Sequence, residues 1–215
     1  VQDVASGWDP GSRGDEGSRQ RWKEEICRIL GEIQASLSPL LLRLCHWLLP
    51  KLLSRLFLSV QLHRGQLEMV LRAARTPKVP LVFVCSHQSQ VDGPLLSFIL
   101  LSQGIGVPRV TVGAWTSPCL RSLLQRLGGI FLPSGMAQTC SDRDEGLPGA
   151  VMDAYVQDVL QSCQPLVLFL EEPPASLRLA DPARQWLLCV LRALRDGAVP
   201  DVLIVPVGIS YDVAP

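Results

Sequence analysis

The sequence predicts an α/β fold in which a mostly parallel sheet is flanked by helices and preceded by an N-terminal helical region. The first observation is a set of short, almost wholly apolar runs, such as LVFVCS at 81–86 and PLVLFLEE at 165–172. Such runs are typical of strands that are buried on both faces. The second is that these runs alternate with longer segments in which apolar residues recur at helical spacing. The third is the length of 215 residues, which suits one domain with an extension.

The first 76 residues are expected to be helical after a flexible tail at 1–19. The tail is rich in Gly and Asp, and it has neither the apolar core of a signal peptide nor the composition of a transit peptide. Residues 20–35 form the first predicted helix, because its apolar side chains share one stripe: Trp22, Ile26, Leu30 and Ile33. Pro50 is expected to divide the helices that follow. These are predicted at 37–48, 51–62 and 64–75.

Residues 77–215 are predicted to form the α/β domain itself. Strands are predicted at 81–86, 108–114, 129–133, 165–172 and 201–212. Helices are predicted at 93–104, 117–128, 147–163 and 181–197, with a polar loop at 134–146. Helix-start and helix-stop residues support two of these helices, because Ser117-Pro118 and Asp181-Pro182 precede them and Gly128 and Gly197 end them.

The leucine-rich segment 36–64 is no clean membrane span, because basic residues such as Arg43 and Lys51 interrupt it. Two interpretations stay open. In one, amphipathic helices lie on a bilayer surface, with Trp47 at the interface and the basic residues toward the lipid headgroups. In the other, the same leucines pack as a helical hairpin on a protein core.

The composition excludes some classes of function. Twenty basic residues balance twenty acidic ones, which argues against a nucleic-acid binder with a large basic surface. Seven cysteines are widely spaced and form no C-x-x-C pair, so no zinc or redox motif is supported. We expect them to be reduced, in a compartment that faces the cytosol.

His87 and Asp92 are the candidate catalytic residues. His87 directly follows the predicted strand 81–86, and Asp92 comes five residues later. Because ligands of open parallel sheets bind at the carboxyl ends of the strands, the pair is expected at the site. A histidine can take a proton from a hydroxyl group, and a carboxylate on its other nitrogen would fix the tautomer. The alternative is that Asp92 only caps the next helix while His87 fills a turn.

Other chemistries have weaker support. The sequence contains neither a G-x-S-x-G nucleophile elbow nor a G-x-x-x-x-G-K-[ST] phosphate loop. Glu171 and Glu172 end a predicted strand, but a metal site built from them would lack His or Cys ligands. We therefore expect no metal.

Four blocks, in order and at matching spacing, carry a resemblance to a known family. They are H-x4-D at 87–92, LGGIFLPSG at 127–135, FLEE at 169–172 and IVPVGISYD at 204–212. Together they resemble the glycerol-3-phosphate acyltransferase family, in its mitochondrial type. The chain ends just past the fourth block, so we expect it to be part of a longer protein.

The resemblance implies transfer of a fatty acyl group from acyl-CoA to the 1-hydroxyl of glycerol 3-phosphate, a step of phospholipid synthesis. His87 would be the general base and Asp92 its partner, with acyl-CoA as co-substrate and no cofactor. Residues implied to line the substrate site are Gly128, Gly129, Phe131, Glu171 and Pro206. The resemblance also implies the cytosolic face of the mitochondrial outer membrane; the oligomeric state stays open.

The sequence departs from the family where an anionic substrate would be held. The family continues its second block with arginine, whereas Pro133 follows Leu132 here. Its third block continues with glycine and then arginine, whereas this chain has Glu172 and Pro174. Arg126, Arg178 and Arg184 are candidates for replacing the missing charges. We expect weakened activity or, as the alternative, a catalytically impaired scaffold at a membrane surface.

Overall fold

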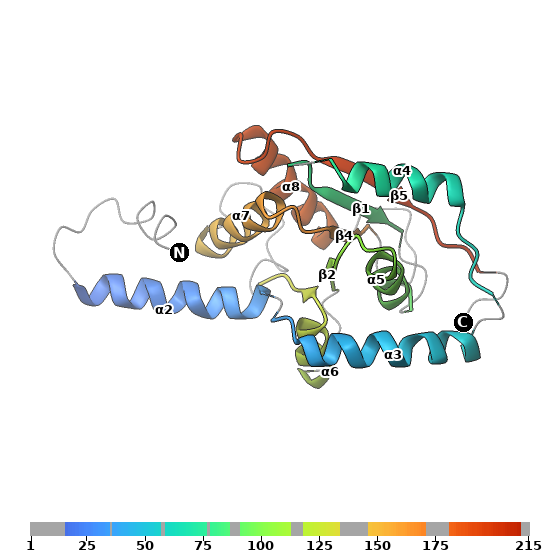
Figure 1. Ribbon diagram of the computed structural model, residues 1–215. Coiled ribbons are helices and arrows are strands. Elements are labelled where there is room, and N and C mark those ends of the chain that lie inside the picture. Colours follow the sequence, from blue (N-terminus) through green and yellow to red (C-terminus); the bar gives the residue numbers. More distant parts are fainter. Residues whose placement is uncertain are drawn as a thin grey trace.

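The computed structural model describes residues 16–34, 36–56, 59–76, 78–86, 91–112, 118–133, 146–170 and 181–211. Within these residues, five strands form one sheet in the order β3-β2-β4-β1-β5, and all neighbouring strands are parallel (Figure 1). The strands are β1 (Leu81–Cys85), β2 (Arg109–Thr111), β3 (Gly129–Ile130), β4 (Leu166–Phe169) and β5 (Leu203–Val207). The predicted α/β class is confirmed.

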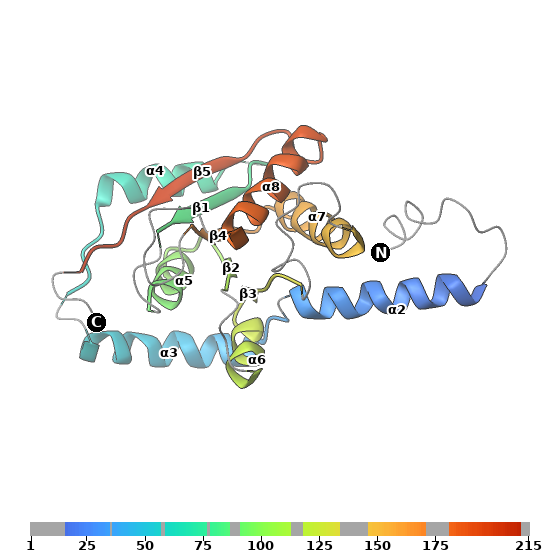
Figure 2. The same ribbon diagram turned by 180° about the vertical axis from the view of Figure 1, so that it is seen from behind.

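Helices precede the sheet and connect its strands in the described part of the chain. They are α2 (Glu16–Ile33), α3 (Pro39–Leu56), α4 (Arg64–Ala74), α5 (Asp92–Ser102), α6 (Pro118–Arg126), α7 (Gly146–Gln161) and α8 (Asp181–Arg195). Figure 2 shows the same arrangement from behind, with α4 alongside β5, α3 below α5, and α6 beside the amino-terminal end of α3. No helix in these ranges is both long enough and apolar enough to cross a membrane.

The alternation of side chains along β1 and β4 divides the apolar core between the two faces of the sheet. Val82 of β1 and Leu168 of β4 face a cluster that α2, α7 and α8 complete, with Trp186 of α8 only 2 % exposed. Phe83 and Val167 point to the other face, where α5 and partly buried residues of α4 cover them. Burial on both faces explains why these strands are almost wholly apolar.

Helix α2 belongs to the first of these core clusters. Ile26, Ile29 and Ile33 are buried, whereas Trp22, at the far end of the predicted stripe, is 40 % exposed. The buried stripe is therefore shorter than the sequence pattern predicted. The helix also begins at Glu16, four residues before the predicted start at 20.

The predicted division of the leucine-rich segment at Pro50 is wrong. Helix α3 runs without a break from Pro39 to Leu56, with Pro50 inside it. A proline removes one helical N–H, but Pro50 is exposed, so water can bond to the carbonyl group that loses its partner. The helix ends at Leu56, so the predicted helix at 51–62 is too long.

The strands are also shorter than predicted at the sheet's far edge. Strand β3 pairs only at Gly129 and Ile130, because its one described neighbour, β2, is itself three residues long. At the other edge, Leu203 and Ile204 of β5 remain 38 % and 55 % exposed. The continuous apolar runs thus predicted the positions of the strands. The residues at which the strands end depend on pairing with the neighbouring strands.

Candidate active site

Asp92 is the only charged side chain that is buried among the residues that the structure describes, with 0 % exposure. It begins α5, at the end of the connection that leaves the carboxyl end of β1. The N-cap of α5 is Val91, whose side chain makes no capping hydrogen bond, and Asp92 is the acidic residue of the first turn. Because a buried carboxylate is costly without hydrogen bonds, its partners decide its role.

Tyr211 supplies one of these partners, because its hydroxyl donates a hydrogen bond to Oδ1 of Asp92. The two residues follow adjacent parallel strands, since β1 and β5 pair in register from Leu81 with Leu203 to Cys85 with Val207. Both side chains therefore reach the same place, beyond the carboxyl edge of the sheet. Tyr211 was not among the candidates predicted from the sequence, where it fell inside the predicted strand 201–212; its one signal was a polar side chain in the fourth block.

Cys85, the last residue of β1, lies under this pair. It is fully buried, and its thiol donates to the carbonyl oxygen of Ser86 at 3.4 Å. Burial, and next the negative charge of Asp92, raise the pKa of the Cys85 thiol to about 11. Burial, followed by the hydrogen bond to Asp92 and the charge of Asp92, also raises the pKa of Tyr211. Both groups therefore keep their protons at neutral pH.

Two of the predicted site residues, His87 and Glu171, lie outside the described residues. The chain is described up to Ser86, directly after β1, and again from Val91, directly before α5. Likewise it is described up to Leu170, directly after β4. The roles of His87 and Glu171 therefore stay predictions.

Gly128 and Gly129 lie at the amino end of β3, away from the edge where Asp92 lies. Gly128 has φ +107°, and a Cβ atom there would lie 2.6 Å from the carbonyl oxygen of Pro108. A Cβ atom on Gly129 would lie 2.9 Å from the carbonyl oxygen of Leu124 in α6. Close packing of β3 against its neighbours accounts for both glycines, and their contact with substrate stays a prediction.

Phe131 follows β3 at its carboxyl end and is 2 % exposed. The Arg121 guanidinium of α6 lies over its ring, 4.5 Å from the centroid, and also donates to the carbonyl oxygen of Glu32 in α2. Three strand spacings separate β3 from β1, which is about 14 Å. Phe131 thus shares the edge with Asp92 but not its immediate surroundings.

Pro206 lies within β5, opposite Val84 of β1, and is exposed. Strand β5 is at the edge of the described sheet, so its outer side pairs with no described strand. The N–H group that proline lacks is therefore not needed for pairing there. The structure therefore places Pro206 in the strand that leads to Tyr211.

The candidate replacement arginines differ in position. Arg126 ends α6, just before the amino end of β3, so it lies at the wrong edge of the sheet for the site. Arg184 lies in the first turn of α8, the helix that returns the chain from the carboxyl end of β4 to the amino end of β5. Arg178 lies outside the described residues. Of the two described candidates, only Arg184 lies on a helix that starts from the carboxyl edge of the sheet, although α8 covers the opposite face from α5.

No group of three or more His, Cys, Asp or Glu side chains could hold a metal ion in the described ranges. Five of the cysteines in the described part of the chain are free thiols: Cys27, Cys45, Cys85, Cys163 and Cys189. The site thus has a buried carboxylate, Asp92, that accepts a hydrogen bond from a neutral phenol, Tyr211. His87 precedes Asp92 by five residues in the chain.

A protein-family model described as Acyltransferase matches residues 66–210 of the chain. The mouse and human proteins named glycerol-3-phosphate acyltransferase 2, mitochondrial, are 46 % and 45 % identical over all of the chain. The human protein named glycerol-3-phosphate acyltransferase 1, mitochondrial, is 35 % identical over 99 % of it. The matches cover 27 %, 27 % and 26 % of these relatives, so the chain spans about a quarter of their length. The resemblance found from the four blocks is confirmed.

Proposed function

The chain belongs to the acyltransferase family, and from that premise we propose that it transfers a fatty acyl group from acyl-CoA to the 1-hydroxyl of glycerol 3-phosphate. The observation that carries the proposal is the buried Asp92 at the carboxyl edge of the sheet, five residues after His87. The names of relatives that match the whole chain support the choice of acceptor. The charge balance of the sequence supports a small-molecule acceptor over a nucleic acid.

In the proposed reaction, His87 takes the proton of the acceptor hydroxyl as its oxygen attacks the thioester carbonyl carbon. A carbon–oxygen bond forms and the carbon–sulfur bond breaks, and the proton passes to the departing thiolate, which leaves as CoA. Asp92 holds the ring of His87 and stabilises the imidazolium that forms. No acyl-enzyme is needed, because the hydroxyl attacks the thioester directly.

We also propose that this activity is weak. A phosphate dianion is best held by bidentate arginine side chains. In this chain Pro133 is buried beyond β3 at the position where the family has arginine. Each lost charge-assisted contact costs about 1.5–3 kcal/mol of binding free energy. Of Arg126 and Arg184, Arg184 is the one on a helix that starts from the carboxyl edge of the sheet, and it is our candidate for restoring part of this binding.

A second candidate function is a catalytically impaired scaffold on a membrane surface, and the exposed face of α3 favours it. Leu40, Leu44, Trp47 and Leu48 recur at helical spacing and are 76 %, 53 %, 60 % and 50 % exposed. The helix contains no acidic residue. These side chains do not pack on the core in the described structure, which supports the membrane-surface alternative.

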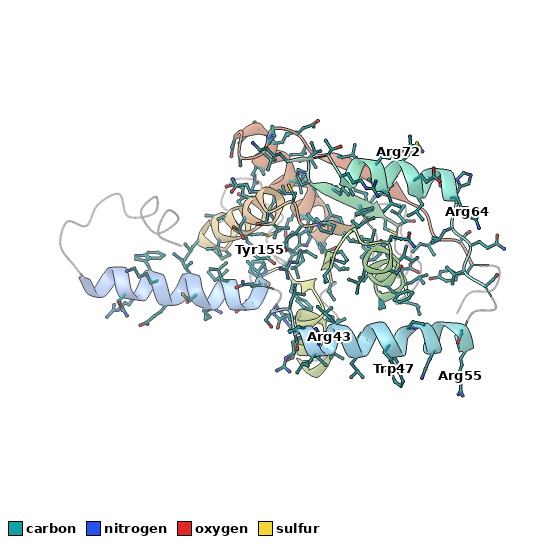
Figure 3. All side chains as sticks on the ribbon, in the orientation of Figure 1. Arg43, Trp47, Arg55, Arg64, Arg72 and Tyr155 are labelled. Atoms are coloured by element: carbon teal, nitrogen blue, oxygen red, sulfur yellow. The ribbon has the colours of Figure 1, made fainter. Side chains whose placement is uncertain are left out.

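The basic residues of α3 share its exposed apolar face. The Lys51 Nζ atom lies 3.6 Å from the centre of the Trp47 ring. Figure 3 shows Trp47 and Arg55 projecting from α3 on the side away from the sheet. Leucine and tryptophan with lysine and arginine suit the boundary between acyl chains and anionic headgroups. We propose that α3 rests on such a surface, on the cytosolic side of the mitochondrial outer membrane, in either candidate function.

One experiment separates the two candidates. The purified chain is incubated with acyl-CoA and radiolabelled glycerol 3-phosphate, and lysophosphatidate and free CoA are both measured; calorimetry measures glycerol 3-phosphate binding in parallel. The enzyme proposal expects equal amounts of the two products and saturable binding at millimolar concentrations or tighter. Neither product above background, with no saturable binding, would contradict it and favour the scaffold.

A further inference from the structure

Tyr211 has no role in the proposed mechanism, yet it bonds directly to the one buried charged side chain in the described structure. We propose that Tyr211 is a positioning residue: its hydroxyl fixes the carboxylate of Asp92 in the orientation from which Asp92 serves the histidine base. The inference rests on the proposed function, because it assigns Tyr211 a part in the same acid–base pair.

The topology explains how a residue so distant in sequence reaches Asp92. Cys85 and Val207 are the last paired residues of β1 and β5. From there the chain runs seven residues to Asp92 and four residues to Tyr211. The hydrogen bond thus joins the two connections that leave neighbouring strand ends. It holds the first turn of α5 against the segment after β5.

The chemistry of a phenol suits this task better than that of a cationic partner. A phenol with a pKa well above neutral donates a hydrogen bond without neutralising the carboxylate, so the full negative charge remains for an imidazolium. An arginine in the same place would share that charge and weaken its effect on the histidine. The other titratable group that faces the pair among the described residues, Cys85, is a neutral thiol at neutral pH.

The first test is a double-mutant cycle on the full chain. Tyr211→Phe keeps the ring and removes the hydroxyl, and we expect kcat to fall roughly ten- to a hundredfold, the range for one hydrogen bond to a charged group, while KM for glycerol 3-phosphate stays within about twofold. In an Asp92→Asn background the same substitution should change kcat by less than about twofold. An equal loss in both backgrounds would overturn the inference, because Tyr211 would then act independently of Asp92.

The chain offers a matched control, since Tyr155 is its other tyrosine. Tyr155 lies on α7 in the core cluster with α2 and α8 and is 8 % exposed. Tyr155→Phe removes a buried phenol hydroxyl on the opposite face of the sheet from α5. We expect kcat of Tyr155→Phe to stay within about twofold of the wild type. A similar fall in Tyr155→Phe and Tyr211→Phe would instead indicate a general cost of losing a tyrosine hydroxyl.

A readout without activity keeps the inference separate from the proposed function. In the Tyr155→Phe protein, the absorbance change at 295 nm on raising the pH reports ionisation of Tyr211 alone, with circular dichroism confirming that the chain stays folded. We expect less phenolate at pH 10.5 than for a free tyrosine, whose pKa is about 10, and severalfold more when Asp92→Asn is added.

The titration and the kinetics together distinguish failure of the inference from failure of the proposed function. No change in the titration with Asp92→Asn overturns the contact and the inference, whatever the activity. A shifted titration in a chain without acyl transfer refutes the proposed function and, with it, the positioning role of Tyr211 in catalysis. A shifted titration, with non-additive kinetics, supports both.

Discussion

The backbone at Gly128 passes the carbonyl group of Pro108 so closely that a Cβ atom would lie 2.6 Å from its oxygen. Pro108 immediately precedes β2 and Gly128 immediately precedes β3, so the contact lies where the two parallel strands begin to pair. Gly128 also has φ +107°, a region that other L-residues rarely adopt. The glycine pair of the second block is therefore needed for the fold, whatever contact it makes with substrate.

Three glycine-to-alanine substitutions separate backbone strain from crowding. Gly128→Ala combines a positive φ with a clash against backbone, and we expect it to lower the free energy of unfolding by about 3 kcal/mol. Gly104→Ala has φ +74° but open space, so about 1 kcal/mol is expected. Gly31→Ala, in the exposed interior of α2, should raise stability by about 0.5–1 kcal/mol. Urea unfolding measures all three, and a loss at Gly128 no greater than at Gly104 would contradict the crowding.

Cys85 should make the chain lose stability in alkali. The folded chain holds this proton up to a pKa of about 11, whereas the ordinary value is 9.0. Between these values the native state binds more protons than the unfolded state, so stability is full below pH 9 and falls as pH rises through 11. At pH 10.5 the loss from Cys85 is about 2 kcal/mol.

Chemical unfolding at pH 8 and pH 10.5 measures this effect. Cys85→Ser removes the titrating thiol at similar volume, so its stability should fall by about 2 kcal/mol less than that of the wild type over the same interval. Tyr211, whose pKa is also raised, contributes to both proteins alike with the same sign. Parallel losses in wild type and variant would rule out a perturbed thiol.

The exposed face of α3 should bind anionic membranes. Replacing Leu44 and Leu48 together by Asp removes apolar area worth about 1.5–3 kcal/mol for each side chain and adds repulsion. We expect membrane binding to fall more than tenfold. Flotation of the full chain with phosphatidylcholine vesicles that contain phosphatidylinositol measures it.

Met69→Asp is the matched control for that experiment, because Met69 is 64 % exposed on a different helix, α4. It should float as the wild type does, and added salt should weaken wild-type binding because Arg43, Lys51 and Arg55 contribute. Recovery of the wild type in the soluble fraction, or equal flotation of the α3 and α4 variants, would refute the membrane surface.

Much of the fold could be predicted because local patterns decide it. The run LVFVC is apolar throughout since Val82 and Phe83 face different halves of the core. Helix-stop glycines such as Gly197, with φ +72°, occur where the sequence pattern predicted them. Pro50 led to a wrong prediction of a helix break, because water can bond to the carbonyl group that a proline leaves without a partner on an exposed helix face. The exposure of Trp22 could not be predicted, since it depends on where α7 stops covering α2.

The site was predictable only in part, because its contacts are between distant segments. Asp92 was found from its place five residues after a histidine and just after a strand. Its bond to Tyr211 depends on β5 lying next to β1, and periodicity along the chain carries no information on strand order. The structural need for Gly128 depends in the same way on the approach of Pro108.

The central claim is that this chain performs acyl transfer with His87 as the base. The most direct test compares kcat/KM for glycerol 3-phosphate, with acyl-CoA as donor, between the wild type and His87→Ala, with circular dichroism confirming equal folding. The account predicts measurable wild-type transfer and a loss of at least about a hundredfold in the variant. Equal rates in the two proteins would contradict it.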